Sequence, residues 1–310
     1  LTWTTPAIES LYYYLHGATG VDLFFAISGF VIARDLHPKL AACKNFRSFL
    51  HISLAFWIRR VWRIFPLAWL WLGVILLATA FFKKSGIFGS FDIALDGTIA
   101  AIFQYYNYRL ALCFNNYDCG ANFYYWTLSL EEQYYLLLPL VILLSRKWLP
   151  YLLSGAILFQ MFFPHRPPMM SIFRTDALLL GVMIALWSRK KSYEGFRLHI
   201  LERRWLRRIA IAGLFLVMLT DARLNAGPLG DFSYGVIAII CAGLVLIGSY
   251  DADYLMAPGV VKKFLMWLGS RSCSMYLVHI PAYFGTQEIW YRIAPQGITP
   301  DQRLQVILTA

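Results

Sequence analysis

The stretch Gly20–Ile32 most constrains this chain, because it joins a carboxylate to an apolar run that is long enough to enter a bilayer. Asp22 stands near its start, and only Ser28 and Gly29 interrupt the apolar residues that follow. An acid at the mouth of a membrane helix is costly unless the protein needs it. Later apolar runs also carry Arg, Asp, Glu or His at their ends. The pattern predicts a polytopic membrane protein with chemistry near one face.

The composition favours a membrane location. Hydrophobic residues make up 59% of the 310 residues and charged residues only 15%, whereas a soluble domain is about 45–50% apolar and roughly 25% charged. Such a chain has too little polar surface for water to surround it on all sides. Its 11 tryptophans and 19 tyrosines fit the aromatic belts of bilayer interfaces.

Candidate membrane spans set the expected fold. A helix needs about 20 predominantly apolar residues to cross a bilayer. The candidates are 20–36, 56–82, 126–145, 148–163, 172–188, 209–221, 232–249, 265–286 and a run that starts near 302. The predicted fold class is therefore all-α, a polytopic transmembrane helical bundle with about nine spans present.

Basic residues orient these spans. Of the 28 lysines and arginines, 19 lie in the segments 34–63, 146–147, 189–208 and 250–264, which the positive-inside rule places on the inner side. The net charge of +11 follows this pattern, so we expect no nucleic-acid partner. Both flanks of the apolar stretch 91–107 then fall outside. That stretch cannot cross once, and we predict a re-entrant or surface-lying helix there.

Cys113 and Cys119 bracket a polar loop within 108–125, a segment that the charge pattern places outside. An outside compartment permits disulfides. We therefore regard a disulfide between Cys113 and Cys119 and two free thiols as equally expected alternatives.

Three arginines in the segment Arg59–Pro66 form the first candidate site. Arg59 and Arg63 lie four residues apart, and Arg60 lies three before Arg63, so on a helix the three guanidinium groups share one side. A guanidinium group can donate two parallel hydrogen bonds to the oxygens of a phosphate, which favours an anion-binding site. A positive-inside anchor whose side chains reach the lipid headgroups explains the same residues.

A second candidate is Glu131, which adjoins Glu132 near the outer end of the span 126–145. Adjacent helical residues point about 100° apart, so at most one of these acids readily faces the interior. A catalytic carboxylate is one interpretation. The other is an acid that supports a helix cap formed by Thr127 or Ser129.

Arg174, Asp176 and His279 complete the set of candidate site residues. Arg174 and Asp176 lie at an outer span end, where they form a local ion pair or part of a site. His279 is expected deep in a span, and ionisable groups within a membrane are functional by default. With Asp22 and Glu131 these residues fall toward outer span ends, whereas the arginine motif falls toward the inner side. This separation suits an enzyme that takes a phosphorylated donor inside and delivers a group outside.

Taken together and in this order, the motifs resemble the acyltransferase family 3 of integral membrane proteins, which O-acylate glycans and related acceptors. The matching stretches are Gly20–Phe30, Arg59–Pro66, Trp126–Tyr135, Arg174 with Asp176, and Ser274–His279. The resemblance implies a single membrane acyltransferase domain over 1–310 and a fold of about ten transmembrane helices. The first helix and the end of the last one are expected to lie outside this chain.

The resemblance implies transfer of an acyl group, usually acetyl, from acyl-coenzyme A to a hydroxyl of a surface or exported glycan. Arg59, Arg60 and Arg63 would bind the coenzyme A phosphates from the inner side, and no metal is expected. The family's catalytic histidine lies on the first helix. His16 lies closer to Gly20 than the catalytic histidine does in the family pattern, so His16 is either a loop residue or the catalytic base. The family also implies a bacterial inner membrane.

In the expected mechanism a histidine base deprotonates the acceptor hydroxyl, and Asp22 or Glu131 orients the imidazole as the third member of a triad does. Arg174 or a helix end stabilises the oxyanion. A transporter or flippase of a glycan or lipid-linked substrate is the alternative, since it also places polar groups in membrane spans, often within internal repeats. We find no such repeat, which favours the enzyme.

Overall fold

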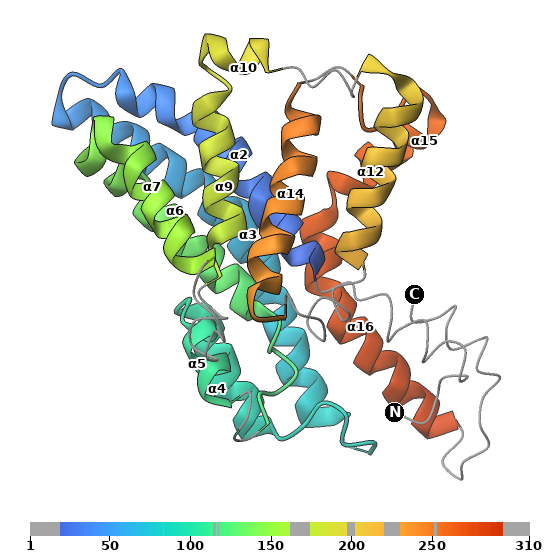
Figure 1. The fold of residues 1–310 in the computed structure, drawn as a ribbon. Helices are drawn as coiled ribbons and strands as arrows, with labels where there is room; N and C mark the ends of the chain where they lie inside the picture. The colour runs from blue at the N-terminus through green and yellow to red at the C-terminus, as the bar shows by residue number, and fades with distance from the viewer. Residues whose placement is uncertain are drawn as a thin grey trace. The chain divides into compact units, whose positions relative to one another are not determined.

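The computed structural model describes residues 19–82, 84–113, 116, 118–161, 174–196, 202–219, 230–250 and 253–293. Every regular element in these ranges is a helix (Figure 1), so the predicted all-α class is confirmed. The chain divides into two compact units. Within the described ranges, the first unit holds 54–135 and 264–293, and the second holds 19–53 and 136–263.

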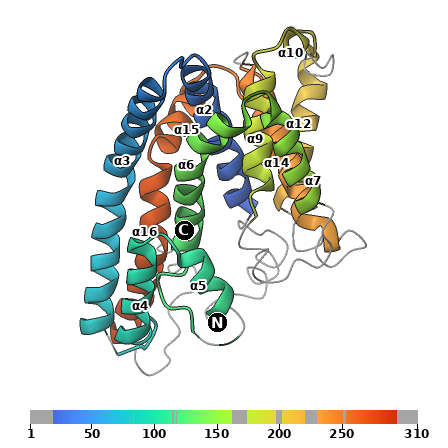
Figure 2. The ribbon, with the colours of Figure 1, turned by 90° about the vertical axis from the view of Figure 1, so that its left-hand side faces the viewer.

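The first unit is built on the helices that carry the arginine and glutamate motifs. Its elements are α3 (Phe46–Phe81, from residue 54), α4 (Phe91–Ile102), α5 (Tyr106–Cys113), α6 (Tyr125–Ser145, up to residue 135), α15 (Val260–Gly269, from residue 264) and α16 (Ser272–Ile293). Tyr125 Oη donates to the carbonyl of Ala68 on α3 at 2.7 Å. The adjacent Tyr124 Oη donates to the carbonyl of Leu277 on α16 at 3.0 Å. These bonds hold α3, α6 and α16 side by side (Figure 2).

The stretch 91–107, which we predicted to be a re-entrant or surface-lying helix, holds α4 and the start of α5. α4 ends at Ile102, and Gln104 adopts a left-handed backbone with a φ of 58° before α5 begins at Tyr106. A left-handed residue breaks the right-handed helical path. The 12 residues of α4 extend about 18 Å, whereas a hydrocarbon core is roughly 30 Å thick. Neither helix is long enough to cross a bilayer by itself.

The predicted span 265–286 is wrong as a single helix. α15 ends at Gly269 and α16 begins at Ser272. Glycine and serine are poor formers of helix interiors, and the charged Arg271 lies between the two helices. Its Nη1 donates to the carbonyl of Trp267 on the preceding turn at 3.3 Å, which satisfies one of the carbonyl groups left open at the end of α15.

The second unit corresponds to the predicted spans 20–36, 148–163, 172–188, 209–221 and 232–249, with shifted ends. Its principal elements are α2 (Gly20–Ala41), α7 (Leu149–Met161), α9 (Asp176–Trp187), α10 (Lys191–Gly195), α12 (Arg204–Leu219) and α14 (Ser233–Ser249). It also holds the start of α3, the end of α6 and the short 3₁₀ turns Arg146–Trp148 and Gly230–Phe232.

α2 and α9 approach each other closely because each presents a glycine to the other. A Cβ built on Gly29 would lie 2.1 Å from the carbonyl oxygen of Leu178. A Cβ built on Gly181 would lie 2.1 Å from the carbonyl oxygen of Ala26. Small residues allow membrane helices to pack backbone against backbone. The glycine that interrupts the first apolar run is therefore a helix-packing position.

Gly29→Ala is expected to destabilise the second unit by about 1–3 kcal/mol or more, because the added methyl group overlaps the backbone of α9. Thermal unfolding in detergent should show a lower midpoint than for the wild type. Gly213→Ala on α12 is the matched control, since nothing lies within 4 Å of its built Cβ. Equal midpoints for Gly29→Ala and the wild type would contradict the close packing.

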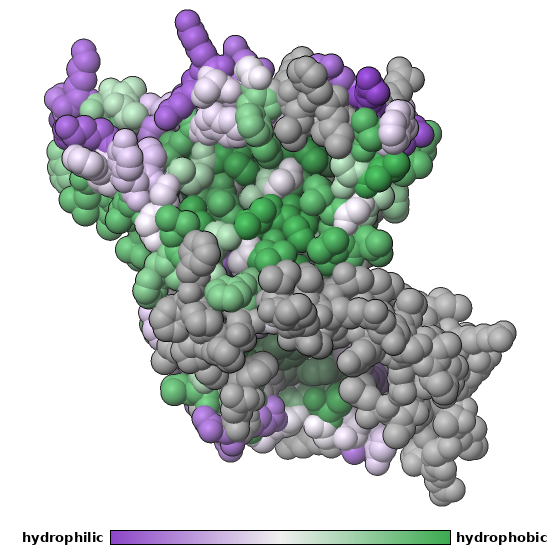
Figure 3. Space-filling view, viewed as in Figure 1, coloured by the Kyte–Doolittle hydropathy of each residue, from purple (hydrophilic) through white to green (hydrophobic). Residues whose placement is uncertain are grey.

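Among the residues that the structure describes, two helical stretches are long and apolar enough to cross a membrane by length and composition, Phe46–Phe81 and Tyr125–Met161. In the second unit, apolar side chains cover α9 and α14, and hydrophilic ones gather toward the end that carries α10 (Figure 3). Arg189, Lys190 and Lys191 are exposed there, as expected of a loop on the inner side. The predicted total of about nine spans stays a prediction.

Candidate functional site

Glu131 is the most deeply buried charged group of the motif on α6. The residue is 3% exposed, and its Oε1 accepts a hydrogen bond from Tyr135 Oη, one turn further along the helix. Glu132 is only half-buried. Because α6 begins at Tyr125, Glu131 lies beyond the first turn in which an acid supports a helix end. The helix-capping interpretation is therefore wrong for this residue.

Arg60 packs against the same tyrosine. Its guanidinium carbon lies 4.8 Å from the centre of the Tyr135 ring and 5.7 Å from the centre of the Phe56 ring, within the cation–π range of about 6 Å. The two rings meet edge to face, with 6.1 Å between their centres. Arg60 is partly buried, whereas Arg59 and Arg63 are exposed.

The arginines and the acid do not occupy opposite faces as predicted. α3 begins at Phe46 rather than near residue 56, so the arginine motif lies in the interior of the helix. Arg60 and Glu131 contact the same side chain, that of Tyr135, and therefore share one level of the first unit. The predicted separation of positive and negative groups across the bilayer is wrong for this pair.

His279 lies in the interior of α16, and its side chain is exposed. Its Nδ1 is hydrogen-bonded to the carbonyl oxygen of Tyr276. Because a carbonyl oxygen only accepts, Nδ1 carries the proton, and Nε2 of the neutral ring keeps its lone pair. The imidazole centre lies 5.2 Å from the centre of the Tyr276 ring and 5.4 Å from that of Tyr124. The ring is thus held in a tautomer that suits a base.

Tyr276 connects the imidazole to the glutamate helix. Its Oη lies 2.5 Å from Thr127 Oγ1 and donates to the carbonyl of Tyr124 at 2.7 Å. Thr127 lies four residues before Glu131, on the same face of α6. The first unit therefore places Tyr276, which contacts the imidazole of His279, against the helix that carries Glu131.

Asp22 and Arg174 form a buried ion pair in the second unit. Arg174 Nε donates to Asp22 Oδ1 at 2.9 Å, and Nη2 donates to Oδ2. The two side chains are 2% and 13% exposed, respectively, and the guanidinium carbon lies 4.7 Å from the centre of the Tyr234 ring. A bidentate pair fixes the orientation of both groups. The structure thus gives Arg174 a bidentate partner on α2, and the negative charge of the nearby Asp176 also acts on the guanidinium.

Asp176 is 1% exposed at the start of α9, where its Oδ1 accepts from the backbone N–H of Ala177 at 3.2 Å. The backbone N–H of Thr175 donates to Gln160 Oε1 on α7 at 3.0 Å. The bond between Thr175 and Gln160 attaches the start of α9 to α7, next to Arg174.

The predicted site residues fall into two sets. Glu131, His279 and the arginine motif belong to the first unit, whereas Asp22, Arg174 and Asp176 belong to the second. His16 lies outside the described residues. Among the residues that the structure describes, no group of three or more His, Cys, Asp or Glu side chains is placed to hold a metal ion.

Sequence reasoning missed the tyrosines that join these motifs. Tyr135 follows Glu131 by four residues, a spacing that puts the two side chains on one helix face, so the sequence held a usable signal for this contact. Tyr276 and Tyr124 lie on different elements and meet only through the packing of α16 against α6. No spacing within one helix could have predicted that meeting.

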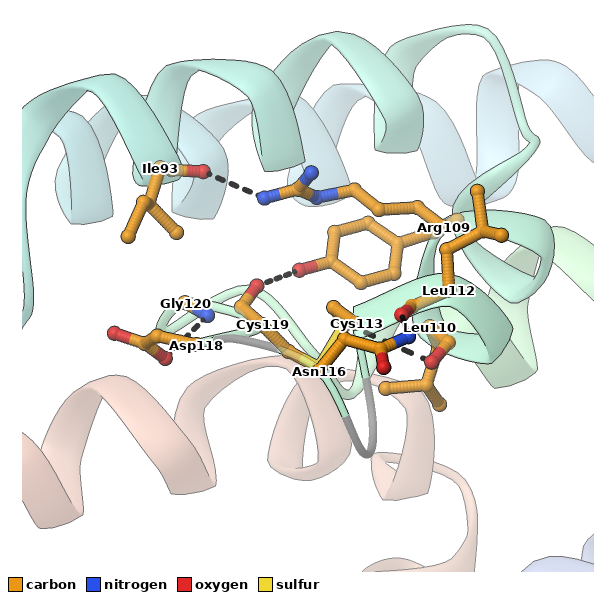
Figure 4. The surroundings of a disulfide bond; sticks show 10 residues. Ile93, Arg109, Leu110, Leu112, Cys113, Asn116, Asp118, Cys119 and Gly120 are labelled. Carbon is orange, nitrogen blue, oxygen red and sulfur yellow. Dashed lines mark hydrogen bonds between the residues drawn. A yellow bond between two sulfur atoms is a disulfide. The ribbon is translucent and has the colours of Figure 1, made fainter. Parts of the chain in front are cut away.

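Cys113 and Cys119 form a disulfide that closes the loop after α5 (Figure 4). Next to it, Tyr106 Oη donates to the carbonyl of Cys119 at 2.6 Å. Burial raises the pKa of Tyr106 to about 12, so its hydroxyl keeps the proton of this bond at neutral pH. Asp118 Oδ1 accepts from the backbone N–H of Gly120 at 2.8 Å. The bridge and these bonds hold the segment 118–120 against α5.

Cys113 and Cys119 are expected to react with an external, membrane-impermeant maleimide only after reduction, because the bridge blocks both thiols. The experiment uses right-side-out vesicles and a chain in which the remaining cysteines, Cys43, Cys241 and Cys273, are replaced by alanine. Labelling without reductant would contradict the bridge. Labelling that requires permeabilised vesicles would contradict the outer position of the loop.

The chain matches the family model described as an acyltransferase domain over residues 2–308. It belongs to this family of acyltransferases, whose members are integral membrane proteins. The resemblance that the five motifs suggested is therefore confirmed.

Two bacterial proteins illustrate what the chain is similar to. The peptidoglycan O-acetyltransferase OatA of Listeria monocytogenes is 25% identical over 294 residues, which cover 86% of this chain and 44% of that protein. The O-acetyltransferase OatA of Staphylococcus aureus is 28% identical over 286 residues, which cover 86% and 46%. The chain spans less than half the length of these relatives. No solved structure matches it.

Proposed function

We propose that this protein transfers an acyl group, specifically acetyl, from acyl-coenzyme A to a hydroxyl of a cell-surface or exported glycan. Membership of an acyltransferase family over residues 2–308 is the observation that carries the proposal. The names of the two relatives, both O-acetyltransferases and one of peptidoglycan, support an acetyl donor and a glycan acceptor.

The protein would act in a bacterial inner membrane, and the whole domain would have about ten transmembrane helices. The basic loops support an inner side from which the donor enters. The disulfide between Cys113 and Cys119 supports an oxidising outer side toward which the acceptor lies.

The transfer needs a base and a stabilised negative charge. The base takes the proton of the acceptor hydroxyl, whose oxygen attacks the thioester carbonyl carbon. A carbon–oxygen bond forms, the carbon–sulfur bond breaks, and coenzyme A leaves as the thiol with that proton. His279 is the candidate base of the first unit because its Nε2 holds the lone pair. His16 is the other candidate.

Glu131 would stabilise the charged imidazole, as the acid of a triad does. Its burial at 3% exposure strengthens such an interaction, since little water screens the charge. The arginines of α3 would bind the phosphates of the donor. Asp22, Arg174 and Asp176 form a second candidate centre, in which Arg174 would supply positive charge to the oxyanion.

Transfer to a defined acceptor tests the proposal. The full chain is reconstituted in lipid nanodiscs with acetyl-labelled acetyl-coenzyme A and soluble peptidoglycan fragments. We expect alkali-labile label in the glycan and an equal amount of released coenzyme A thiol. Thiol release no faster than in protein-free nanodiscs would overturn the proposal. Movement of unlabelled glycan across vesicles, without ester formation, would favour the flippase instead.

A further inference from the structure

The three arginines of α3 do not share one environment. Arg59 and Arg63 are exposed, whereas the guanidinium of Arg60 lies over the rings of Tyr135 and Phe56. An aromatic face attracts a cation through its quadrupole and so restricts where the guanidinium lies. Arg60 is therefore less available to a mobile phosphate than its two neighbours are.

Tyr135 joins Arg60 to Glu131. The tyrosine is 2% exposed, and its hydroxyl donates to the Glu131 carboxylate. Its carbonyl accepts from the indole N–H of Trp57 on α3 at 3.0 Å, so its backbone is fixed to the arginine helix. One buried side chain thus sets the position of a cation on α3 relative to a carboxylate on α6.

The chemistry of the donor separates the possible roles. In acyl-coenzyme A the phosphates and the thioester stand at opposite ends of the pantetheine arm. The guanidinium of Arg60 is held against the ring whose hydroxyl bonds Glu131, so it serves the same end of the donor as Glu131 does, whereas the exposed side chains of Arg59 and Arg63 can turn toward the phosphates. If Glu131 supports the chemistry at the thioester, Arg60 does not bind the phosphates.

We propose that Tyr135 and Arg60 are positioning residues for the Glu131 carboxylate, and that only Arg59 and Arg63 bind the phosphates of the donor. The inference rests on the proposed acyl transfer. The Tyr135 hydroxyl orients one carboxylate oxygen, and the Arg60 cation stabilises the negative charge of the group. Both effects favour the ionised carboxylate that stabilises a charged imidazole during transfer.

Steady-state kinetics with acetyl-coenzyme A separate the two roles. Tyr135→Phe keeps the ring and removes the hydroxyl, so we expect a kcat roughly 10–100-fold lower and an unchanged KM for the donor. Arg60→Ala should have the same signature, and Arg60→Lys should restore part of kcat because the ring still holds a cation. Arg63→Ala should raise the KM and leave kcat unchanged.

Equilibrium binding of acetyl-coenzyme A checks that each variant is folded, since Tyr135→Phe and Arg60→Ala should bind it as the wild type does. A raised KM with an unchanged kcat for Arg60→Ala would overturn the inference, and so would a wild-type kcat for Tyr135→Phe. If Arg60→Ala does not fold, Tyr135→Phe and Arg60→Lys decide the question. A wild type without transfer would instead overturn the proposed function.

Discussion

Glu131→Gln is expected to lower acyl transfer by roughly 10²–10⁴-fold, the range typical of a lost acid–base contribution. The amide matches the carboxylate in shape and can still accept a hydrogen bond from Tyr135, whose hydroxyl donates to this position. It carries no charge, so it cannot stabilise a charged imidazole. The measurement is the initial rate of coenzyme A thiol release with glycan present, under saturating donor.

The variant should keep both its fold and its donor affinity, because the substitution removes charge without removing volume. Glu194→Gln is the matched control: Glu194 is exposed on α10 in the second unit, and its rate should equal that of the wild type. A wild-type rate for Glu131→Gln would remove this residue from the mechanism. A lost affinity for acetyl-coenzyme A would assign it to donor binding instead.

Arg174→Met is expected to destabilise the second unit by about 3–5 kcal/mol, because it leaves the Asp22 carboxylate buried without its cation. Asp22 is 2% exposed and receives two hydrogen bonds from the guanidinium. Unfolding by a denaturing detergent, followed by tryptophan fluorescence, measures the loss. Lys190→Met also removes a positive charge, but from an exposed position, and should be close to neutral.

The double variant Asp22→Leu/Arg174→Met gives this prediction a second check. Replacing both members of a buried ion pair by apolar residues is often nearly neutral, so the double variant should be more stable than Arg174→Met alone. Two results would contradict the buried pair: an Arg174→Met protein as stable as the wild type, or a double variant no more stable than the single one.

The sequence predicted the helices well, because long apolar runs dominate both the composition and the packing of such a chain. It could not predict where polar residues break a run. The segment 265–286 is apolar on average, although its helix ends at Gly269. The segment 91–107 is also apolar on average, although the left-handed backbone of Gln104 interrupts it. Such breaks depend on a few backbone angles, and mean hydropathy does not record them.

The residues of the candidate site could be predicted from the sequence, but the contacts between them could not. Asp22 and Arg174 were both identified, yet their pairing depends on the contact between α2 and α9, which lie far apart in the sequence. Arg60 and Glu131 were assigned to opposite sides because a charge count locates the ends of spans only coarsely. Their common contact, Tyr135, was overlooked because the sequence does not show which partner a buried tyrosine hydroxyl finds.

Binding of labelled acetyl-coenzyme A to the reconstituted protein tests the central claim most directly, namely that an acyl donor binds through Arg59 and Arg63 of α3. Saturable binding is expected for the wild type. Arg59→Ala/Arg63→Ala should weaken it at least roughly tenfold, since a hydrogen bond between charged groups contributes about 1.5–3 kcal/mol. Lys190→Ala/Lys191→Ala removes the same charge from the second unit and should bind as the wild type does. No saturable binding to the wild type, or equal weakening in both double variants, would contradict the account.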